Sequence, residues 1–207
     1  MEASGATFSA TKPNLGRKTM HTIRLQSRSY EILHSGIYPS VKDAVEAALR
    51  EGICLDRLRL HNADLRDINL DGIHLREADF SGCNLTGANL SESTLLQCNF
   101  SDCQMFNACL CYSDLEQCVF HNTEFGGTDI SETILKACFF SGPSTFGLNF
   151  ITSSSMSDSS YIDEDGQMLP MTKPPVVILG LLSPIRFLDL HVLTDNGTRR
   201  KYASTNC

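Results

Sequence analysis

The sequence predicts an all-β repeat fold, and two regularities carry this prediction. Every fifth residue from Leu60 to Phe140 is large and apolar, without a gap. The residue two positions before each of these is small in most repeats, as at Ala78, Cys98 and Ser113. A helix requires an apolar period near 3.6 and a strand a period of 2, so a period of five fits neither and indicates a repeat architecture.

The repeats resemble a known family. Ala63-Asp64-Leu65, Ala78-Asp79-Phe80 and Ala88-Asn89-Leu90 match the consensus Ala-(Asp/Asn)-Leu-X-X of the pentapeptide-repeat proteins. The resemblance covers residues 55–140 and implies a right-handed four-sided parallel β-helix of about four coils, with four pentapeptides in each coil. A regularity of twenty residues supports four sides, because one column of centres reads Leu60, Phe80, Phe100, Phe120 and Phe140. Since neighbouring strands lie ~4.8 Å apart, we expect these rings to stack.

The segment before the repeats predicts a helical cap. Ser40 and Asp43 resemble a capping box, an apolar stripe follows at helical spacing, and Gly52 ends the pattern. We therefore expect a helix at 40–51 within an N-terminal cap of residues 20–54, preceded by a short strand at 21–25. Such a cap would cover backbone groups that an open end of a β-helix exposes. Residues 1–19 are expected to be a disordered leader.

Beyond the repeats, Ser141-Gly142-Pro143 interrupts the pattern, and residues 141–175 are predicted to be a loop or linker. Residues 176–207 are predicted to form a C-terminal β-hairpin cap or a dimerisation element. Its strands are expected at 176–182, 185–193 and 198–202, with a turn at Asp195-Asn196-Gly197. This tail loosely resembles that of some phage- and prophage-type members of the family.

The cysteines are interpreted as core residues. Five of the nine occupy the small inward position: Cys83, Cys98, Cys103, Cys118 and Cys138. Cysteine there acts as a small buried apolar residue, and an odd internal set favours a reducing compartment, which we take to be the cytoplasm. Cys109-x-Cys111 lacks a second matched pair, so neither a metal site nor another cofactor is predicted.

Charge and composition restrict the classes of partner. The net charge is −7, which argues against direct binding of nucleic acid, and no apolar run approaches the ~20 residues that span a bilayer. Between Glu77 and Leu135 there are nine acidic residues and no Lys or Arg. The expected partner is a protein with a basic or DNA-binding surface.

One side of the predicted helix gathers acids without a base. The column centred on Leu70, Leu90, Leu110 and Ile130 displays Asp71, Glu92, Asp129 and Glu132, with Tyr112 at its middle. Two interpretations stay open: a solvated surface that prevents aggregation, and a docking face for a basic partner. The resemblance adds that some family members imitate DNA and bind DNA gyrase in its place. The function it implies is inhibition of a DNA-handling protein, such as a topoisomerase or a host-defence enzyme.

Several apolar residues are expected to point outward: Leu96, Phe106, Val119, Ile134 and Phe139. They are interpreted as covered by the C-terminal section or as an interface for a partner or a second copy of the chain. The alternative function is therefore a structural or adaptor protein, with a homodimer left open. No enzyme is predicted, because the six histidines are scattered and no phosphate-binding loop or dinucleotide motif is present.

Overall fold

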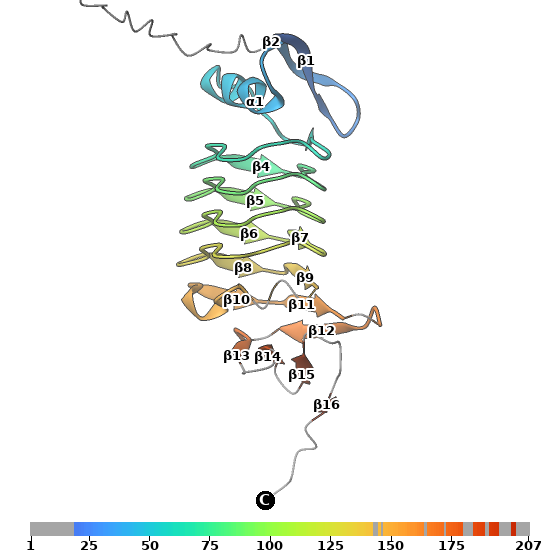
Figure 1. Cartoon of the computed structure of the whole chain (residues 1–207), viewed down its shortest axis with the longest axis vertical. Helices are drawn as coiled ribbons and strands as arrows, with labels where there is room; N and C mark the ends of the chain where they lie inside the picture. The colour runs from blue at the N-terminus through green and yellow to red at the C-terminus, as the bar shows by residue number, and fades with distance from the viewer. Residues whose placement is uncertain are drawn as a thin grey trace, which may run out of the picture.

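The computed structural model describes residues 19–142, 145, 147–163, 165–171, 173–179, 184–188, 191–194 and 200–201. The predicted leader, apart from Thr19, and the predicted turn at 195–197 lie outside these residues. Figure 1 shows a stack of flat coils, with the N-terminal cap at one end and a group of antiparallel strands at the other.

The coils form a parallel β-helix. On one side β4 (His74–Arg76), β5 (Thr94–Leu96), β6 (Asp114–Glu116) and β8 (Ile134–Lys136) pair in parallel, each strand 20 residues after the one before. On a second side β7 (Val119–Phe120) pairs with β9 (Phe139–Ser141). Two further ladders of single bridges, Asp64–Asn84–Gln104–Glu124 and Asn69–Asn89–Cys109–Asp129, make the remaining sides. The predicted β-helix of about four coils is confirmed.

The core is filled by the two inward positions of each repeat. All the large centres from Leu60 to Phe140 are buried. The rings of Phe80, Phe100, Phe120 and Phe140 stack in one column, with centroids 5.3, 5.3 and 5.2 Å apart and interplanar angles of 2°, 6° and 9°. The coil spacing therefore turns the twenty-residue period of the sequence into a continuous aromatic stack.

The second inward position is small because it touches the backbone of the preceding coil. The hydroxyls of Ser93, Ser113 and Thr133 donate to carbonyl oxygens 23 residues earlier, at 2.9, 2.7 and 2.7 Å. The five predicted core cysteines are buried and free, and the Sγ of Cys103 lies 2.9 Å from the carbonyl oxygen of Phe80. A hydroxyl or thiol can thus be buried there because its hydrogen has an acceptor.

Burial of these thiols predicts a loss of stability at alkaline pH. It raises the pKa of Cys83 to about 11 and that of Cys103 to about 12, from 9.0. Above pH 9 the unfolded chain releases these protons before the folded chain does, so the free energy of unfolding falls up to about pH 12. At ~1.4 kcal/mol per pKa unit, the two thiols together account for a fall on the order of 7 kcal/mol by about pH 12.

Urea denaturation at about pH 8 and about pH 10.5 measures this fall. A Cys83→Ala/Cys103→Ala variant should lose less stability than the wild type, and alanine fits because Ala78, Ala88 and Ala108 occupy the same repeat position. An equal loss in both proteins would rule out these two thiols as the cause.

The N-terminal cap combines a hairpin with a helix. β1 (His21–Ser27) pairs antiparallel with β2 (Ile32–Tyr38) and with β3 (Leu58–Arg59), the first strand of the β-helix. α1 (Val41–Arg50) is capped by Ser40, whose Oγ accepts from the Asp43 backbone N–H at 3.2 Å. Its buried face, which consists of Ala44, Val45, Ala47 and Ala48, packs on the core. The predicted helix is confirmed, and of the predicted capping box the bond from the Asp43 backbone N–H to Ser40 is present. The hairpin partner β2 was not predicted.

The prediction of a loop at 141–175 is wrong, because the chain makes a further coil there. β10 (Ser155–Ser157) pairs in parallel with β8, and β11 (Ser159–Ile162) pairs in parallel with β9. A 3-10 turn, η2 (Phe150–Thr152), precedes them. Partners are now 21 residues apart instead of 20, since Leu135 faces Met156 and Phe140 faces Tyr161. One extra residue after Phe150 accounts for the shift, and the ring of Phe150 closes the aromatic stack edge-on against Phe140.

The β-helix then ends by reversal of the chain. β12 (Met168–Met171) runs antiparallel to β11. β13 (Val176–Leu179), β14 (Pro184–Leu188), β15 (His191–Thr194) and β16 (Arg200–Lys201) follow as an antiparallel sheet. C-terminal strands are therefore present as predicted. The single strand expected at 185–193 is instead two, because β14 ends at Leu188 and pairs back with β15 from His191.

Candidate protein-binding surface

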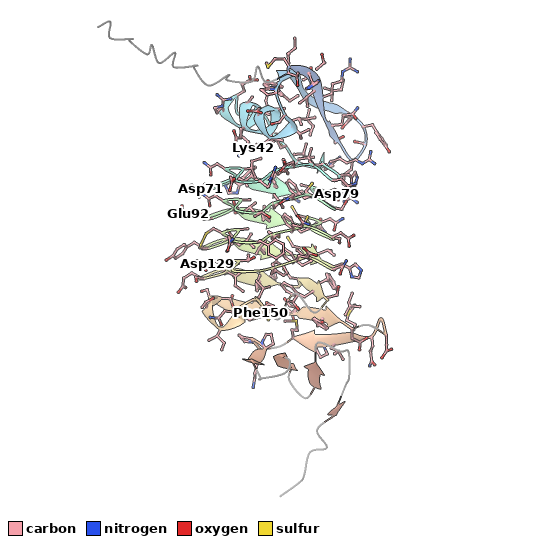
Figure 2. The ribbon with its side chains drawn as sticks, viewed as in Figure 1. Lys42, Asp71, Asp79, Glu92, Asp129 and Phe150 are labelled. Atoms are coloured by element: carbon pink, nitrogen blue, oxygen red, sulfur yellow. A yellow bond between two sulfur atoms is a disulfide. The ribbon has the colours of Figure 1, made fainter. Side chains whose placement is uncertain are left out.

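We call the side whose outward ladder is Asn69, Asn89, Cys109 and Asp129 the acidic side. Asp71, Glu92, Asp129 and Glu132 are all exposed on it. Figure 2 shows Asp71, Glu92 and Asp129 along one edge of the stack and Asp79 on the opposite edge. Glu92 and Glu132 occupy the same corner turn two coils apart, with φ of 55° and 57°, and Tyr112 occupies it on the coil between them. The structure thus brings the predicted acids onto one side.

In the described structure, ion pairs involve several acids of the β-helix but none of the four on this side. Ion pairs among the described residues join Arg57 to Glu77, Arg66 to Asp64 and Lys136 to Glu116, and two histidines pair with Glu51 and Asp79. No ion pair in the described part of the chain involves Asp71, Glu92, Asp129 or Glu132. Their negative charge is therefore not neutralised by an ion pair within the described chain.

Hydrogen bonds fix two of these carboxylates. Asp129 Oδ1 accepts from the backbone N–H and from Oγ of Ser131 at 2.9 and 2.6 Å, and these bonds lower the pKa of Asp129. Asp71 Oδ1 accepts from Ser91 Oγ at 2.7 Å. Both carboxyl groups are held in fixed positions on the outer surface.

The N-terminal end of the acidic side meets the cap. Lys42 Nζ donates to the carbonyl oxygens of Arg66 and Asp67, both at 2.8 Å. Arg50 and Asp71 line the same hollow of about 520 Å³ beneath α1. The base-free part of the surface therefore begins one coil further on, at Glu92.

The middle of the acidic side carries an aromatic residue and two cysteines in place of acids. Tyr112 is 66% exposed at the corner turn between Glu92 and Glu132. Cys109 and Cys111 point outward on either side of the buried Leu110 and are joined by a disulfide. The Sγ of Cys111 lies 3.4 Å from Oδ2 of Asp129. The cysteine pair and this carboxylate therefore form one cluster, which the sequence prediction of no metal site did not consider.

The five predicted apolar surface residues do not form a single patch. Val119 and Phe139 are adjacent on one side, Leu96 and Ile134 lie in the β4–β10 sheet, and Phe106 lies beyond the ladder residue Gln104 on a third side. Phe106 and Ile134 are 37% and 41% exposed. The described C-terminal strands lie at the end of the stack (Figure 1). They therefore do not cover these five residues, contrary to the expectation from the sequence.

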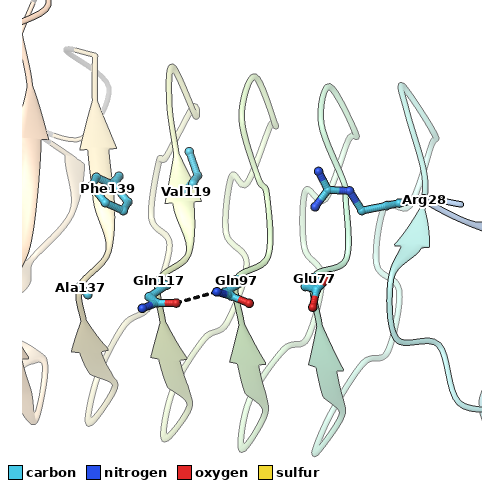
Figure 3. Close-up of a pocket in the computed structure, with 7 residues that line it drawn as sticks. All are labelled: Arg28, Glu77, Gln97, Gln117, Val119, Ala137 and Phe139. Atoms are coloured by element: carbon cyan, nitrogen blue, oxygen red, sulfur yellow. Dashed lines mark hydrogen bonds between the residues drawn. The ribbon is translucent and has the colours of Figure 1, made fainter.

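Val119 and Phe139 line a shallow groove at one corner of the β-helix. Its volume is about 600 Å³, and Figure 3 shows its lining of Arg28, Glu77, Gln97, Gln117, Val119, Ala137 and Phe139. The side chains of Gln97 and Gln117 are hydrogen-bonded at 2.8 Å. The groove thus combines apolar, amide and charged side chains, as a binding surface does. Of the five predicted apolar residues, Val119 and Phe139 are the two that line it within the described chain.

A Ser81–His61–Asp79 grouping looks like a hydrolase triad but has the wrong proton arrangement. His61 Nδ1 lies 2.6 Å from Ser81 Oγ, and its Nε2 lies 3.6 Å from Asp79. Arg59 Nε donates to the same Nε2 at 2.8 Å. In a neutral imidazole the proton must then be on Nδ1, so His61 donates to Ser81 and cannot accept its proton.

Comparison with known proteins agrees with this architecture. Residues 54–95 and 98–136 match the sequence profile of the family described as Pentapeptide repeats, in eight copies. No curated protein sequence matches the chain. None of the helices in the described part of the chain has the length and apolar character needed to cross a bilayer.

Three solved structures are similar in part. A pentapeptide repeat protein from the thylakoid lumen of Arabidopsis thaliana is 31% identical over 37% of this chain and 57% of its own, with a TM-score of 0.33. The pentapeptide repeat protein Rfr23 from the cyanobacterium Cyanothece 51142 is 15% identical over 61% of this chain and 97% of its own, with a TM-score of 0.44. QnrB1, a plasmid-mediated fluoroquinolone resistance protein, is 20% identical over 42% of this chain and 48% of its own, with a TM-score of 0.35. This chain thus spans little more than half of the Arabidopsis protein and less than half of QnrB1.

Proposed function

We propose that this chain, which belongs to the pentapeptide-repeat proteins through residues 54–136, is a non-enzymatic module that binds the basic surface of a DNA-handling protein and inhibits it. The binding surface is the acidic side, with Asp71, Glu92, Asp129 and Glu132 as its charges and Tyr112 as its central contact. The observation that carries this proposal is that four exposed acids, unpaired among the described residues, lie on a side whose repeats, 68–72, 88–92, 108–112 and 128–132, contain no Lys or Arg.

The spacing of the four carboxylates supports imitation of DNA. They lie on the first, second and fourth coils, with Asp129 and Glu132 on the same coil, so three steps of ~4.8 Å place them along ~14 Å. The mean interval is about 5 Å, of the same order as the 3.4 Å between phosphates along one DNA strand. A surface that binds a phosphate strand through Lys and Arg would meet negative charges over a similar length here. The target class we propose is a topoisomerase or a host-defence enzyme in the cytoplasm of a bacterium, with this chain supplied by the bacterium or by a phage.

Charge reversal tests the acidic side. A variant with Asp71, Glu92, Asp129 and Glu132 changed to Lys should lose capture of the partner from bacterial lysate at low salt. The matched control changes four acids on the other sides, Asp102, Asp114, Glu116 and Glu124, to Lys. Its net charge is therefore the same as that of the test variant. We expect the control to retain the partner, because placement of the charges, and not their total, determines complementarity.

Two results would contradict the proposal. One is capture of the same nucleic-acid enzyme by the wild type and by the acidic-side variant. The other is binding that does not weaken as salt rises, since contacts between exposed charges are screened over ~10 Å at 0.1 M salt.

The groove lined by Val119 and Phe139 favours a second candidate function, a structural or adaptor protein. In this case an apolar side chain of the partner would enter the groove, and the C-terminal strands would join two copies of the chain. Binding would then be insensitive to salt and would be lost on changing Phe139 to Ser. Binding that is retained by the Phe139→Ser variant and lost at high salt would rule out the adaptor function.

A further inference from the structure

We propose that Cys109, Cys111 and Asp129 form a redox-gated binding site for a thiophilic divalent cation, for which Zn²⁺ is the probe. The proposal does not rest on the proposed protein-binding function, although the site shares Asp129 with the acidic side. One ligand atom from each residue, the two Sγ atoms and a carboxylate oxygen, lies within 4.8 Å of the others.

The β-helix itself brings these groups together. Cys109 and Cys111 flank the inward-facing Leu110, so both thiols point to the same outer surface. Asp129 is the parallel partner of Cys109 on the next coil. The three ligands therefore come from two adjacent coils of a rigid ladder, with a Cα–Cα distance of 5.5 Å between the cysteines.

The donor set matches the preference of Zn²⁺, which binds thiolate at ~2.3 Å and carboxylate at ~2.0–2.2 Å in tetrahedral sites. Those bond lengths place a sulfur and an oxygen ligand ~3.6 Å apart. Cys111 Sγ and Asp129 Oδ2 are already 3.4 Å apart. Three protein ligands leave the fourth position for water, as in open zinc sites.

Asp129 is oriented for this role. Ser131 holds its Oδ1 through the backbone N–H and Oγ, at 2.9 and 2.6 Å. The other oxygen, Oδ2, is thereby directed toward the sulfur atoms. Carboxylates that bind a metal are usually oriented by hydrogen bonds to their other oxygen, as Ser131 orients Asp129 here.

The disulfide gates the site, because its sulfur atoms carry no negative charge and cannot both contact one ion. Two molecules of a thiol such as glutathione supply two electrons and two protons, which break the S–S bond and leave two protein thiols and one glutathione disulfide. Binding of Zn²⁺ releases the two thiol protons. Oxidation by a low-molecular-weight disulfide runs in the other sense: the two thiolates give up two electrons, the S–S bond reforms, and the ion leaves.

Accessibility sets this pair apart from the other described cysteines. Cys83, Cys98, Cys103, Cys118 and Cys138 are fully buried, whereas Cys109 and Cys111 are partly exposed. Cys54 is exposed but has no described thiol partner. The loading of the site leaves its charge at −1, since two thiolates and one carboxylate offset the two positive charges of the ion.

The experiment is titration of the full, untagged chain with Zn²⁺ against a chromogenic chelator, and with Co²⁺ to read sulfur-to-metal absorption. All variants carry Cys54→Ser and Cys207→Ser, which leaves the pair as the exposed thiols under study. We expect one ion per reduced chain and none per oxidised chain. Cys109→Ser/Cys111→Ser should abolish binding, and Ser131→Ala should weaken it by ~10-fold.

Asp129→Asn decides between three ligands and two, with Glu132→Gln as its matched control on the same side. We expect Asp129→Asn to weaken binding by more than ~10-fold and Glu132→Gln to leave it unchanged. Absence of binding to the reduced chain, equal binding to the oxidised chain, or an Asp129→Asn affinity equal to the wild type would each overturn the proposal. Circular dichroism of each variant verifies that the β-helix is intact.

Discussion

Replacement of Phe100 by alanine is expected to lower the free energy of unfolding by ~3–5 kcal/mol. The ring is fully buried and lies between Phe80 and Phe120, each 5.3 Å away and nearly parallel. Its removal leaves a cavity in the middle of the stack, and the coils above and below are held by their backbone ladders and cannot close it. Urea denaturation followed by circular dichroism measures the change.

Phe106→Ala is the matched control, because it removes the same ring from the surface, where 37% of the residue is exposed. We expect a loss of less than ~1 kcal/mol there. Phe100→Leu should lie between the two, since leucine fills most of the volume and is the residue found at other centres. Equal losses for Phe100→Ala and Phe106→Ala would show that the stack does not stabilise the fold.

The second large effect is expected at the cap. Ala48→Asp places a charge on the buried face of α1, where Ala48 has no exposed surface. An unpaired buried charge costs ~3–5 kcal/mol, so α1 should detach from the first coil. The uncovered coil then presents unpaired backbone groups, which associate with other chains.

Size-exclusion chromatography with light scattering measures that association at several protein concentrations. Arg50→Asp introduces the same side chain at an exposed position of the same helix and serves as the control. A monomeric and fully stable Ala48→Asp protein would show that α1 is not required to close the β-helix.

The fold was predictable at positions where a single requirement, such as burial in the core or capping of a helix, determines the type of residue. The five-residue period follows directly from the inward centres, and the capping box at Ser40 and Asp43 follows from local hydrogen bonds. The further coil was missed, although Thr145 and Phe150 continue the period and are buried. A search for large apolar residues every five positions misses this coil, because Thr145 is small and one extra residue precedes Met156. The backbone pairing accommodates the extra residue, whereas a fixed five-residue period does not. β2 was missed since Ile32 and Ile37 are exposed, which disguises the alternation of a strand.

The candidate site was predictable only in part. The twenty-residue column correctly placed the four acids on one side, because charges in a β-helix follow the register of the coils. Whether an acid is paired depends on side-chain reach across coils, as for Lys136 and Glu116 at 2.9 Å. The third ligand of the cysteine cluster was not found, since Asp129 lies 18 residues after Cys111 and a search for paired Cys motifs does not examine carboxylates on the next coil.

The constant rise of the coils has a consequence for how such a chain can change over generations. Residues 81–100 are one complete turn, because residues 20 apart occupy equivalent places on consecutive coils. A duplication of such a block in the gene would lengthen the rod by ~4.8 Å and leave α1 and β12 at its ends unaltered. An insertion of another length has to be absorbed locally if the side chains that follow are to keep their walls. The extra residue before Met156 is absorbed in this way, because β10 and β11 still pair with β8 and β9. Growth without such an adjustment is therefore possible only in whole turns, and the length of the charged side changes by the same step.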